Sequence, residues 1–501
     1  MNIAEYLSRS AQQYPEKIAL IFVEQQWSYR QLHEKSRILA AHLQGLGVRR
    51  GDRVAIYMPN CPEFVLSYYA VEGLGALAVT LSALLKRREI AEEITDCGAR
   101  ALITTRDLMA HIPDTTELPH LQHIIVAGGA AGEHIPLESL LDGPELAEWV
   151  PLSPDDGAAI LYTSGTTGYP KGAVLTHGNV TSNVAATVRY TGMTSDDRLM
   201  CFLPLFHCFG QNFIMNACVA AGATLILHPK FEFDEILHSA HHHEVTMFFA
   251  VPTIYKRLYD ANIPHEVLRS IRYYFTAAAK MPKELALDWK DRYGMPIYEG
   301  YGLTECSPFA CYNHATRWVA GSVGTPIEGV DMKVVDLHTG ERLGPHQLGE
   351  ICIKGPNVMK GYWNAPQATA RVIDKEGWLH TGDVGYVDEN GYFFIVDRVK
   401  DMINPGGFTV SPSEIEDVLC LHPGIADACV VGVPHEDLGE AIMAYVVPRG
   451  TVTEQEVLDF CRREMAKHKV PHFVKFVPSI PVSPTGKKLR RLLKPRAPDR
   501  D

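Results

Sequence analysis

Short apolar runs that alternate with helix-like segments constrain the fold of this chain more than any other feature of its sequence. The runs lie at residues 53–58, 101–104, 123–126, 158–162, 224–227 and 247–250. Strands that alternate with helical segments in this way are typical of βαβ units, in which helices cover both faces of a parallel sheet. The sequence therefore predicts an α/β fold, with parallel-rich subdomains in the first part of the chain.

From about residue 321 the pattern changes to short strands separated by turns. Strand-like runs lie at residues 331–336, 349–354, 385–387 and 391–396, with a turn signal at Asn390 and Gly391. This change predicts a β-rich subdomain. Together with the preceding α/β part it is expected to form a large N-terminal domain of residues 1–397.

A second, smaller domain is predicted over residues 398–501. Ser411 and Pro412 suit the start of a helix, and Glu414 is expected to complete a capping box with Ser411. Further strands are expected at residues 428–433, 441–447 and 475–477, with a helix from 454 to about 467. These elements predict a small α+β domain at the C-terminus.

Composition excludes several classes of protein. A chain of 501 residues is too long for one domain. Its 47 Lys and Arg against 59 Asp and Glu give a net charge of -12, which argues against a nucleic-acid-binding surface. The 11 cysteines form no CxxC pair and the N-terminus has no apolar signal core, so a cytoplasmic location is predicted. The uncharged stretch 206–229 is interpreted as a buried helix, a turn and a strand, and no membrane span is expected.

A segment rich in glycine, serine and threonine follows the apolar run at 158–162. It reads Tyr-Thr-Ser-Gly-Thr-Thr-Gly-Tyr-Pro-Lys-Gly over residues 162–172. A turn of this composition can aim backbone N–H groups and hydroxyls at phosphate oxygens, and its lysine adds a cation. It is not a Walker loop, and the alternative interpretation is a hydrophilic loop without function. The residues expected at the phosphates are Thr163, Ser164, Gly165, Thr166, Thr167, Gly168 and Lys171.

Four further motifs follow along the chain. They are Gly-Tyr-Gly-Leu-Thr-Glu at 300–305, Trp-Leu-His-Thr-Gly-Asp at 378–383, Val-Asp-Arg-Val-Lys-Asp at 396–401 and Pro-Val-Ser-Pro-Thr-Gly-Lys at 481–487. In this set and order the chain resembles the adenylate-forming superfamily, which includes acyl-CoA synthetases, nonribosomal adenylation domains and firefly luciferase. The resemblance covers essentially the whole chain and is closest to fatty-acid or aryl-acid CoA ligases.

The resemblance implies an ATP-dependent, AMP-forming acyl-CoA synthetase. Such an enzyme activates a carboxylic acid as an acyl-adenylate, releases pyrophosphate, and then transfers the acyl group to the thiol of coenzyme A. The small C-terminal domain is implied to be mobile, with a hinge at Lys400, so that one cleft can serve both half-reactions.

A first set of residues is implied to bind the phosphates and offset their negative charge. Thr163 and Glu305 are implied to approach Mg²⁺, which offsets phosphate charge. Thr304 is implied to hydrogen-bond the α-phosphate. Lys487 is the implied catalytic cation for charge that builds on the α-phosphorus oxygens, although a lysine in a basic tail is usually only solvated.

The nucleoside is implied to contact a second set of residues. Tyr301 offers a flat face for adenine, and its alternative is an ordinary core tyrosine. Asp383 and Arg398 are implied to bind the ribose; the alternatives are a turn aspartate and a surface ion pair. The other residues expected at the nucleotide are Ala278, Glu299, Gly300, Gly302 and Leu303.

The acid is expected near residues 203–213. By resemblance His207 lies beside the reacting carboxylate, with a satisfied buried histidine as its alternative. No acidic residue occurs between 203 and 213, which argues against an amino acid, since a buried ammonium needs a partner. An apolar pocket for a fatty or aryl acid is predicted from Phe209, Phe213, Val251, Phe275 and Ala277.

Two departures from the family pattern concern the acid channel, and a third, Pro405, precedes the expected thiol tunnel. Ala277 stands where many relatives have glycine, and Lys280 stands where they have proline. The thiol tunnel is implied at Gly406, Gly407 and Phe408, where glycine admits a thin pantetheine arm.

The expected small molecules are ATP, Mg²⁺, coenzyme A and an apolar carboxylic acid. Alternatives are an acyl carrier protein as the thiol acceptor, a nucleotide-binding module without catalysis, and luciferase-like oxygenation. A monomer or homodimer is expected, without nucleic acid. The run His241–His243 is interpreted as a solvated helix face, not a metal site.

Overall fold

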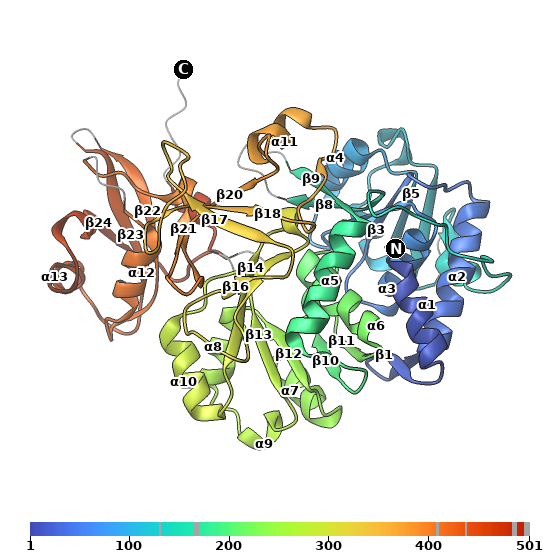
Figure 1. Ribbon diagram of the computed structural model, residues 1–501, viewed down its shortest axis with the longest axis horizontal. Helices are drawn as coiled ribbons and strands as arrows, with labels where there is room; N and C mark the ends of the chain where they lie inside the picture. Colours follow the sequence, from blue (N-terminus) through green and yellow to red (C-terminus); the bar gives the residue numbers. More distant parts are fainter. Residues whose placement is uncertain (130–131, 164–169, 407–409, 436–437, 483–487, 495–501) are drawn as a thin grey trace.

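The computed structural model describes residues 1–129, 132–163, 170–406, 410–435, 438–482 and 488–494. Figure 1 shows a large body built on two extended sheets, an antiparallel sheet beside it, and a smaller C-terminal body at one side. The predicted α/β architecture with a β-rich part and a small α+β part is confirmed.

The first large sheet has eight strands and a mostly parallel centre. Its order is β19 (Gly361–Tyr362), β9 (Lys171–Thr176), β8 (Gly157–Thr163), β4 (Leu77–Leu81), β3 (Arg53–Tyr57), β5 (Ala101–Thr105), β6 (His123–Ala127) and β7 (Ile135–Pro136). Strand β3 shows that both faces of this sheet are buried. Its Val54 and Ile56 are buried in the main core, while Ala55 and Tyr57 are buried in a second core on the opposite face.

The second large sheet has nine strands. Its order is β16 (Thr325–Pro326), β15 (Phe309–Tyr312), β14 (Ile297–Gly302), β13 (Tyr273–Thr276), β12 (Met247–Ala250), β10 (Arg198–Cys201), β11 (Thr224–Leu227), β1 (Ile18–Phe22) and β2 (Gln25–Ser28). Strands β13 and β14 run parallel, and the chain then turns back through antiparallel β15. One continuous core joins this sheet to the first.

Helices pack against both large sheets (Figure 1). They are α1 (Ala4–Gln13), α2 (Tyr29–Gly45), α3 (Pro62–Gly73), α4 (Arg87–Cys97), α5 (His177–Thr191), α6 (Ala217–Ala221), α7 (Phe233–His242), α8 (Pro252–Asp260), α9 (His265–Leu268), α10 (Lys283–Tyr293) and α11 (Pro366–Val372). Short 3-10 segments lie at η1 (Arg106–His111), η2 (Thr115–Glu117), η3 (Leu137–Leu140), η5 (Thr304–Cys306) and η6 (Val399–Asp401). Within the described residues, no helix combines the length and apolarity that a membrane crossing requires.

The uncharged stretch 206–229 folds as predicted, with one difference. It forms a helix, a turn at Gly222 and strand β11, but the first part of the helix, η4 (Phe209–Asn216), is a π-helix that continues into α6. Every residue of η4 is buried, which suits its uncharged composition. A π-helix is wider than an α-helix and often occurs at functional sites, but no sequence pattern predicts it.

The β-rich part is a four-stranded antiparallel sheet, β17 (Asp331–Val335), β18 (Gly349–Lys354), β20 (Leu379–Val387) and β21 (Phe393–Arg398). Strand β20 begins six residues before the predicted run at 385–387, because residues 379–384 also pair with β18 and β21. The 378–383 motif therefore lies largely on a strand.

The C-terminal part has sheet order β22 (Ile425–His435), β23 (Gly439–Pro448) and β24 (Phe473–Phe476), with helices α12 (Pro412–Cys420) and α13 (Glu454–Glu464) and 3-10 segments η7 (Lys467–Lys469) and η8 (Arg490–Leu492). Ser411 caps α12 by accepting from the Glu414 N–H at 3.3 Å. The predicted capping box is only half correct, because the Glu414 carboxylate pairs with Lys469 instead.

Candidate functional site

The phosphate segment begins where β8 ends. Thr163 is the last residue of β8 and pairs in register with Lys171, the first residue of β9. The Thr163 hydroxyl donates to the Lys171 carbonyl at 3.4 Å. The predicted phosphate contacts Ser164, Gly165, Thr166, Thr167 and Gly168 lie outside the described residues.

Asp383 is held by two residues of the predicted nucleoside set. The Tyr301 hydroxyl donates to Asp383 Oδ2 at 2.7 Å, and Arg398 Nε donates to Oδ1 at 2.6 Å. Antiparallel pairing places Asp383 on β20 directly opposite Arg398 on β21, while Tyr301 comes from β14 of the large sheet. Three motifs that are distant in sequence therefore meet at one carboxylate, oriented by charge-assisted hydrogen bonds.

Glu305 has a partner that the sequence did not indicate. The hydroxyl of Tyr362, on β19, donates to Glu305 Oε1 at 2.7 Å. The ring of Tyr362 lies 5.4 Å from Lys171 Nζ, in cation–π contact. Tyr362 thus links the predicted metal carboxylate to the predicted phosphate lysine. Burial and the Glu305 charge raise the pKa of its phenol, which keeps it a donor.

The predicted metal donors fit a hard cation. Thr163 offers a hydroxyl and Glu305 a carboxylate, the oxygen ligands that Mg²⁺ prefers. Since Tyr362 occupies Oε1, Oε2 is the oxygen of Glu305 that could approach an ion. The side chain of Glu305 is buried, which would protect a bound ion from water.

The glycines of the 300–305 motif are required by packing. A Cβ on Gly302 would lie 1.8 Å from the Pro308 carbonyl oxygen, and one on Gly300 would lie 2.4 Å from the Phe275 ring. Close approach of backbones, not a positive φ, explains both glycines. Leu303 follows as the cap of η5.

Glu299 lies within β14, opposite Thr276 at the end of β13, and Ala278 follows β13 by two residues. Glu299 is buried and accepts from the Met281 N–H at 3.1 Å. Burial raises the pKa of its carboxyl to about 8. Ala278 is exposed and has a left-handed backbone, φ 70°, uncommon for alanine. The edge of the sheet where strands β13 and β14 end is where ligands bind in open α/β sheets.

The predicted acid loop contacts this site through Cys208. Its thiol lies 3.6 Å from the Thr304 hydroxyl and 3.8 Å from His207 Nδ1. The Phe209 N–H donates to His207 Nδ1 at 3.2 Å, so the proton of the neutral ring is assigned to Nε2. Burial lowers the pKa of His207 to about 4. His207 is therefore neutral at physiological pH, with Nε2–H as a donor.

The predicted acid-pocket residues pack into one apolar cluster. Phe213 stacks on Phe275 with ring centroids 4.5 Å apart, and Phe209 meets both rings at their edges. All three side chains are buried, as are Val251 and Ala277. Phe309, which the sequence did not single out, contacts Phe213 with centroids 4.4 Å apart. The cluster carries no charge.

The predicted hinge follows β21 directly. Lys400 lies in η6, and Gly406 has a left-handed backbone, φ 58°, with its N–H donating to Leu438 O at 3.0 Å. Asp397 fixes the connection by accepting from the Ser411 hydroxyl at 2.9 Å. The predicted thiol-tunnel residues Gly407 and Phe408 and the predicted catalytic Lys487 lie outside the described residues.

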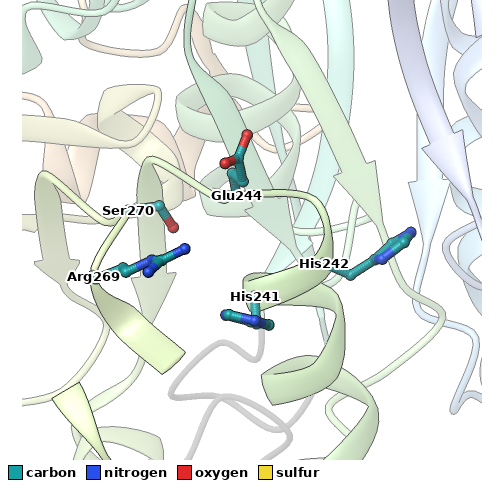
Figure 2. A pocket seen from close by; sticks show the side chains of 5 residues that line it. All are labelled: His241, His242, Glu244, Arg269 and Ser270. Atoms are coloured by element: carbon teal, nitrogen blue, oxygen red, sulfur yellow. The ribbon is translucent and has the colours of Figure 1, made fainter. Parts of the chain in front are cut away.

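A surface hollow lies well away from these residues. Figure 2 shows the side chains that line it, Arg269, Ser270, His241, His242 and Glu244. These residues precede β12 and β13, so they lie at the amino ends of parallel strands whose carboxyl ends carry the nucleotide motifs. His241 and His242 are exposed, which agrees with a solvated helix end.

Comparison with known proteins identifies relatives along the whole chain. The family described as AMP-binding enzyme matches residues 7–363, and the AMP-binding enzyme C-terminal domain matches residues 414–487. A 4-coumarate–CoA ligase of Pinus taeda is 38% identical over 92% of this chain and 88% of the relative. A long-chain-fatty-acid–CoA ligase of Bacillus subtilis (strain 168) is 34% identical over 98% of this chain and 94% of the relative. The crystal structure of ATP-bound MatB from Rhodopseudomonas palustris superposes with a TM-score of 0.91, at 32% identity over 98% of both chains.

Proposed function

The chain belongs to the AMP-binding enzyme family and is an acid–thiol ligase, and from this premise we propose that it activates an apolar carboxylic acid for transfer to coenzyme A. The acid would be a medium- or long-chain fatty acid or an aryl acid. ATP would supply the adenylyl group, giving acyl-AMP and pyrophosphate. The proposal of an apolar acid rests on the uncharged cluster of Phe209, Phe213 and Phe275, because a charged group on the acid's tail would have no partner there.

In the first half-reaction the proposed roles follow the contacts at the site. Asp383, held by Tyr301 and Arg398, would accept from the ribose hydroxyls. Glu305 and Thr163 would hold Mg²⁺, which offsets phosphate charge when bound. Neutral His207 would donate from Nε2 toward the acid's carboxylate and orient it for attack on the α-phosphorus.

The second half-reaction is proposed to require movement of residues 398–501 about Lys400. The motion would withdraw Lys487 and bring Gly406 to the cleft. Replacing Lys400 with proline restricts φ and is expected to slow thioester formation at least ten-fold more than adenylation. Lys400→Ala removes the same side chain without that restriction and should keep the two rates in proportion. Equal losses in Lys400→Pro would contradict the hinge.

Pyrophosphate release from Mg·ATP tests the main proposal. The panel contains cinnamic and benzoic acids, straight-chain fatty acids and amino acids, each with and without coenzyme A. Turnover with an apolar acid that rises on adding coenzyme A is expected. Release only with amino acids would contradict the acid class.

The same panel decides the thiol acceptor. The alternative, loading of an acyl carrier protein, would give release that coenzyme A does not accelerate and that a phosphopantetheinylated carrier does.

A cytoplasmic location is also proposed, since all eleven cysteines are free thiols and ten of them are buried. Fractionation of the native cells would test it, and recovery in a secreted fraction would contradict it.

A further inference from the structure

Glutamate, cysteine and histidine side chains meet on the antiparallel sheet, outside the proposed nucleotide contacts. Cys352 on β18 and His380 on β20 are cross-strand partners. Glu350 precedes Cys352 by two residues on the same strand. One ligand atom from each of Glu350, Cys352 and His380 lies within 4.8 Å of the other two. Three metal-ligating groups of different chemistry therefore converge on one point.

The spacing of these atoms approaches that of a tetrahedral site. His380 Nδ1 lies 3.5 Å from Cys352 Sγ and 2.9 Å from Glu350 Oε2. Around Zn²⁺, bond lengths of about 2.0 Å to nitrogen and 2.3 Å to sulfur place those two atoms roughly 3.5 Å apart. The nitrogen–oxygen separation would have to open by only about 0.4 Å, exchanging the direct hydrogen bond for two metal bonds.

The two polar ligands are each oriented from their far side. Asp374 Oδ2 lies 3.7 Å from His380 Nε2, which leaves Nδ1 for an ion. Glu350 Oε1 accepts from the Gly382 N–H at 2.9 Å, which leaves Oε2. Carboxylates behind ligating histidines are a recurring feature of metal sites because they fix the ring and its tautomer.

The environment selects the kind of ion. Cys352 is buried, and Lys333 lies opposite it on β17. A thiol and an imidazole are ligands that thiophilic cations prefer and Mg²⁺ does not. The side chain of His380 is one-third exposed, which provides a route from solvent.

We propose that Glu350, Cys352 and His380 form a binding site for one thiophilic divalent cation of the Zn²⁺ or Co²⁺ class, with Asp374 as the supporting carboxylate. The site is distinct from the oxygen donors Thr163 and Glu305. It lies next to Asp383, the proposed ribose carboxylate, because Glu350 accepts a hydrogen bond from the N–H of Gly382, the preceding residue.

Titration of the untagged full-length protein with Co²⁺, without nucleotide or Mg²⁺, tests the site. One equivalent is expected to produce a thiolate-to-cobalt charge-transfer band that Zn²⁺ abolishes by competition. Cys352→Ser should lose the band. Cys420→Ser removes the one exposed cysteine and should keep the band.

His380→Asn and Asp374→Asn keep every thiol and guard against a Cys352 variant that fails to fold. Loss of the ring ligand should weaken Co²⁺ binding at least 100-fold, and loss of its supporting carboxylate about 10-fold. Absence of the band in the folded wild-type protein would overturn the proposal. So would a band that survives in Cys352→Ser, or unchanged affinity in His380→Asn.

Discussion

At the scale of single residues, tyrosine hydroxyls orient both carboxylates of the proposed nucleotide site. Tyr301 donates to Asp383, and Tyr362 donates to Glu305, each at 2.7 Å. A carboxylate that is fixed before its ligand arrives loses less conformational freedom on binding, so less of the interaction energy is spent on ordering. In the proposed site the two tyrosines would therefore position the carboxylates for the ribose and the metal.

Tyr362→Phe is expected to reduce ATP–pyrophosphate exchange by roughly 10- to 100-fold and to raise the Mg²⁺ requirement. The reason is loss of a charge-assisted hydrogen bond, worth about 1.5–3 kcal/mol, from a buried carboxylate. Tyr57→Phe is the matched control, since the Tyr57 hydroxyl donates to the Leu85 carbonyl in another part of the sheet. Exchange at the wild-type rate and Mg²⁺ dependence in Tyr362→Phe would show that Glu305 needs no such support.

Sequence reasoning predicted the other residues of this proposed site but did not single out Tyr362. The motifs at 300–305 and 378–383 have local patterns, and the structure joins them at Asp383. Tyr362 lies 57 residues from Glu305, beyond the motif, and no spacing rule connects them. The contact exists because β19 adds to the edge of the eight-stranded sheet, a pairing that only tertiary structure reveals.

Lys487 and Lys488 are neighbours in sequence with different expected roles. Lys487→Ala should reduce adenylate formation by at least 100-fold with ATP affinity nearly unchanged, since a positioned cation stabilises charge that develops at the α-phosphorus. Lys488 pairs with Asp427 at 2.9 Å and with buried Glu416 at 3.3 Å. Lys488→Ala should therefore lower the unfolding temperature of the C-terminal domain. Pyrophosphate exchange and calorimetry separate the two, and normal exchange in Lys487→Ala would remove its catalytic assignment.

At the scale of elements, α3 contains a buried acid without a hydrogen bond. Both carboxylate oxygens of Glu72 lack a hydrogen-bond partner among the described residues, and its nearest ion-pair partner is His177 Nε2 at 3.6 Å. Burial raises the pKa of Glu72 well above its usual value and lowers that of His177 to about 4. Burial therefore favours the neutral form of both side chains.

Glu72→Gln is expected to stabilise the protein at pH 8 and to have little effect at pH 4. The folded state keeps the Glu72 proton that the unfolded chain loses above about pH 4.5, so wild-type stability falls by up to about 1.4 kcal/mol per pH unit above that point. Glutamine has no such linkage, and His177 titrates in both proteins. Urea unfolding at several pH values measures the difference. A variant that is less stable at pH 7 would instead indicate an ionised Glu72–His177 pair.

The elements themselves were largely predictable, and the exceptions have local causes. Runs at 224–227 and 247–250 are strands with the predicted bounds, because buried parallel strands are continuous apolar segments. The run at 349–354 also has the predicted bounds, although polar Glu350 and Lys354 interrupt it. The start of β20 was missed since polar Thr381 and Asp383 break its pattern, and both are hydrogen-bonded within the sheet. Polar residues that serve a site obscure the periodicity of the strand that carries them.

At the scale of the whole molecule, an ion pair joins the two domains in the arrangement of Figure 1. Lys280 follows β13 of the large body, and its ammonium lies 2.6 Å from Asp417 Oδ2 on α12. Both side chains are largely exposed, so the pair should contribute about 1 kcal/mol or less, and less at high salt. That is small against the stability of a fold but sufficient to shift an equilibrium between two domain orientations several-fold.

Lys280→Glu is therefore expected to change the two half-reactions in opposite directions by up to about five-fold, with no change in unfolding temperature. The domain arrangement that contains the ion pair becomes less populated. The half-reaction that uses the other arrangement therefore becomes faster, and the half-reaction that uses this one becomes slower. The double variant Lys280→Glu/Asp417→Lys reverses the pair and should restore the wild-type ratio of adenylation to thioester formation, as measured by single-turnover kinetics. Raising the ionic strength should move the wild-type ratio in the same direction as Lys280→Glu. If both half-reactions changed together, or the double variant gave no recovery, the ion pair would be a surface contact without influence on domain orientation.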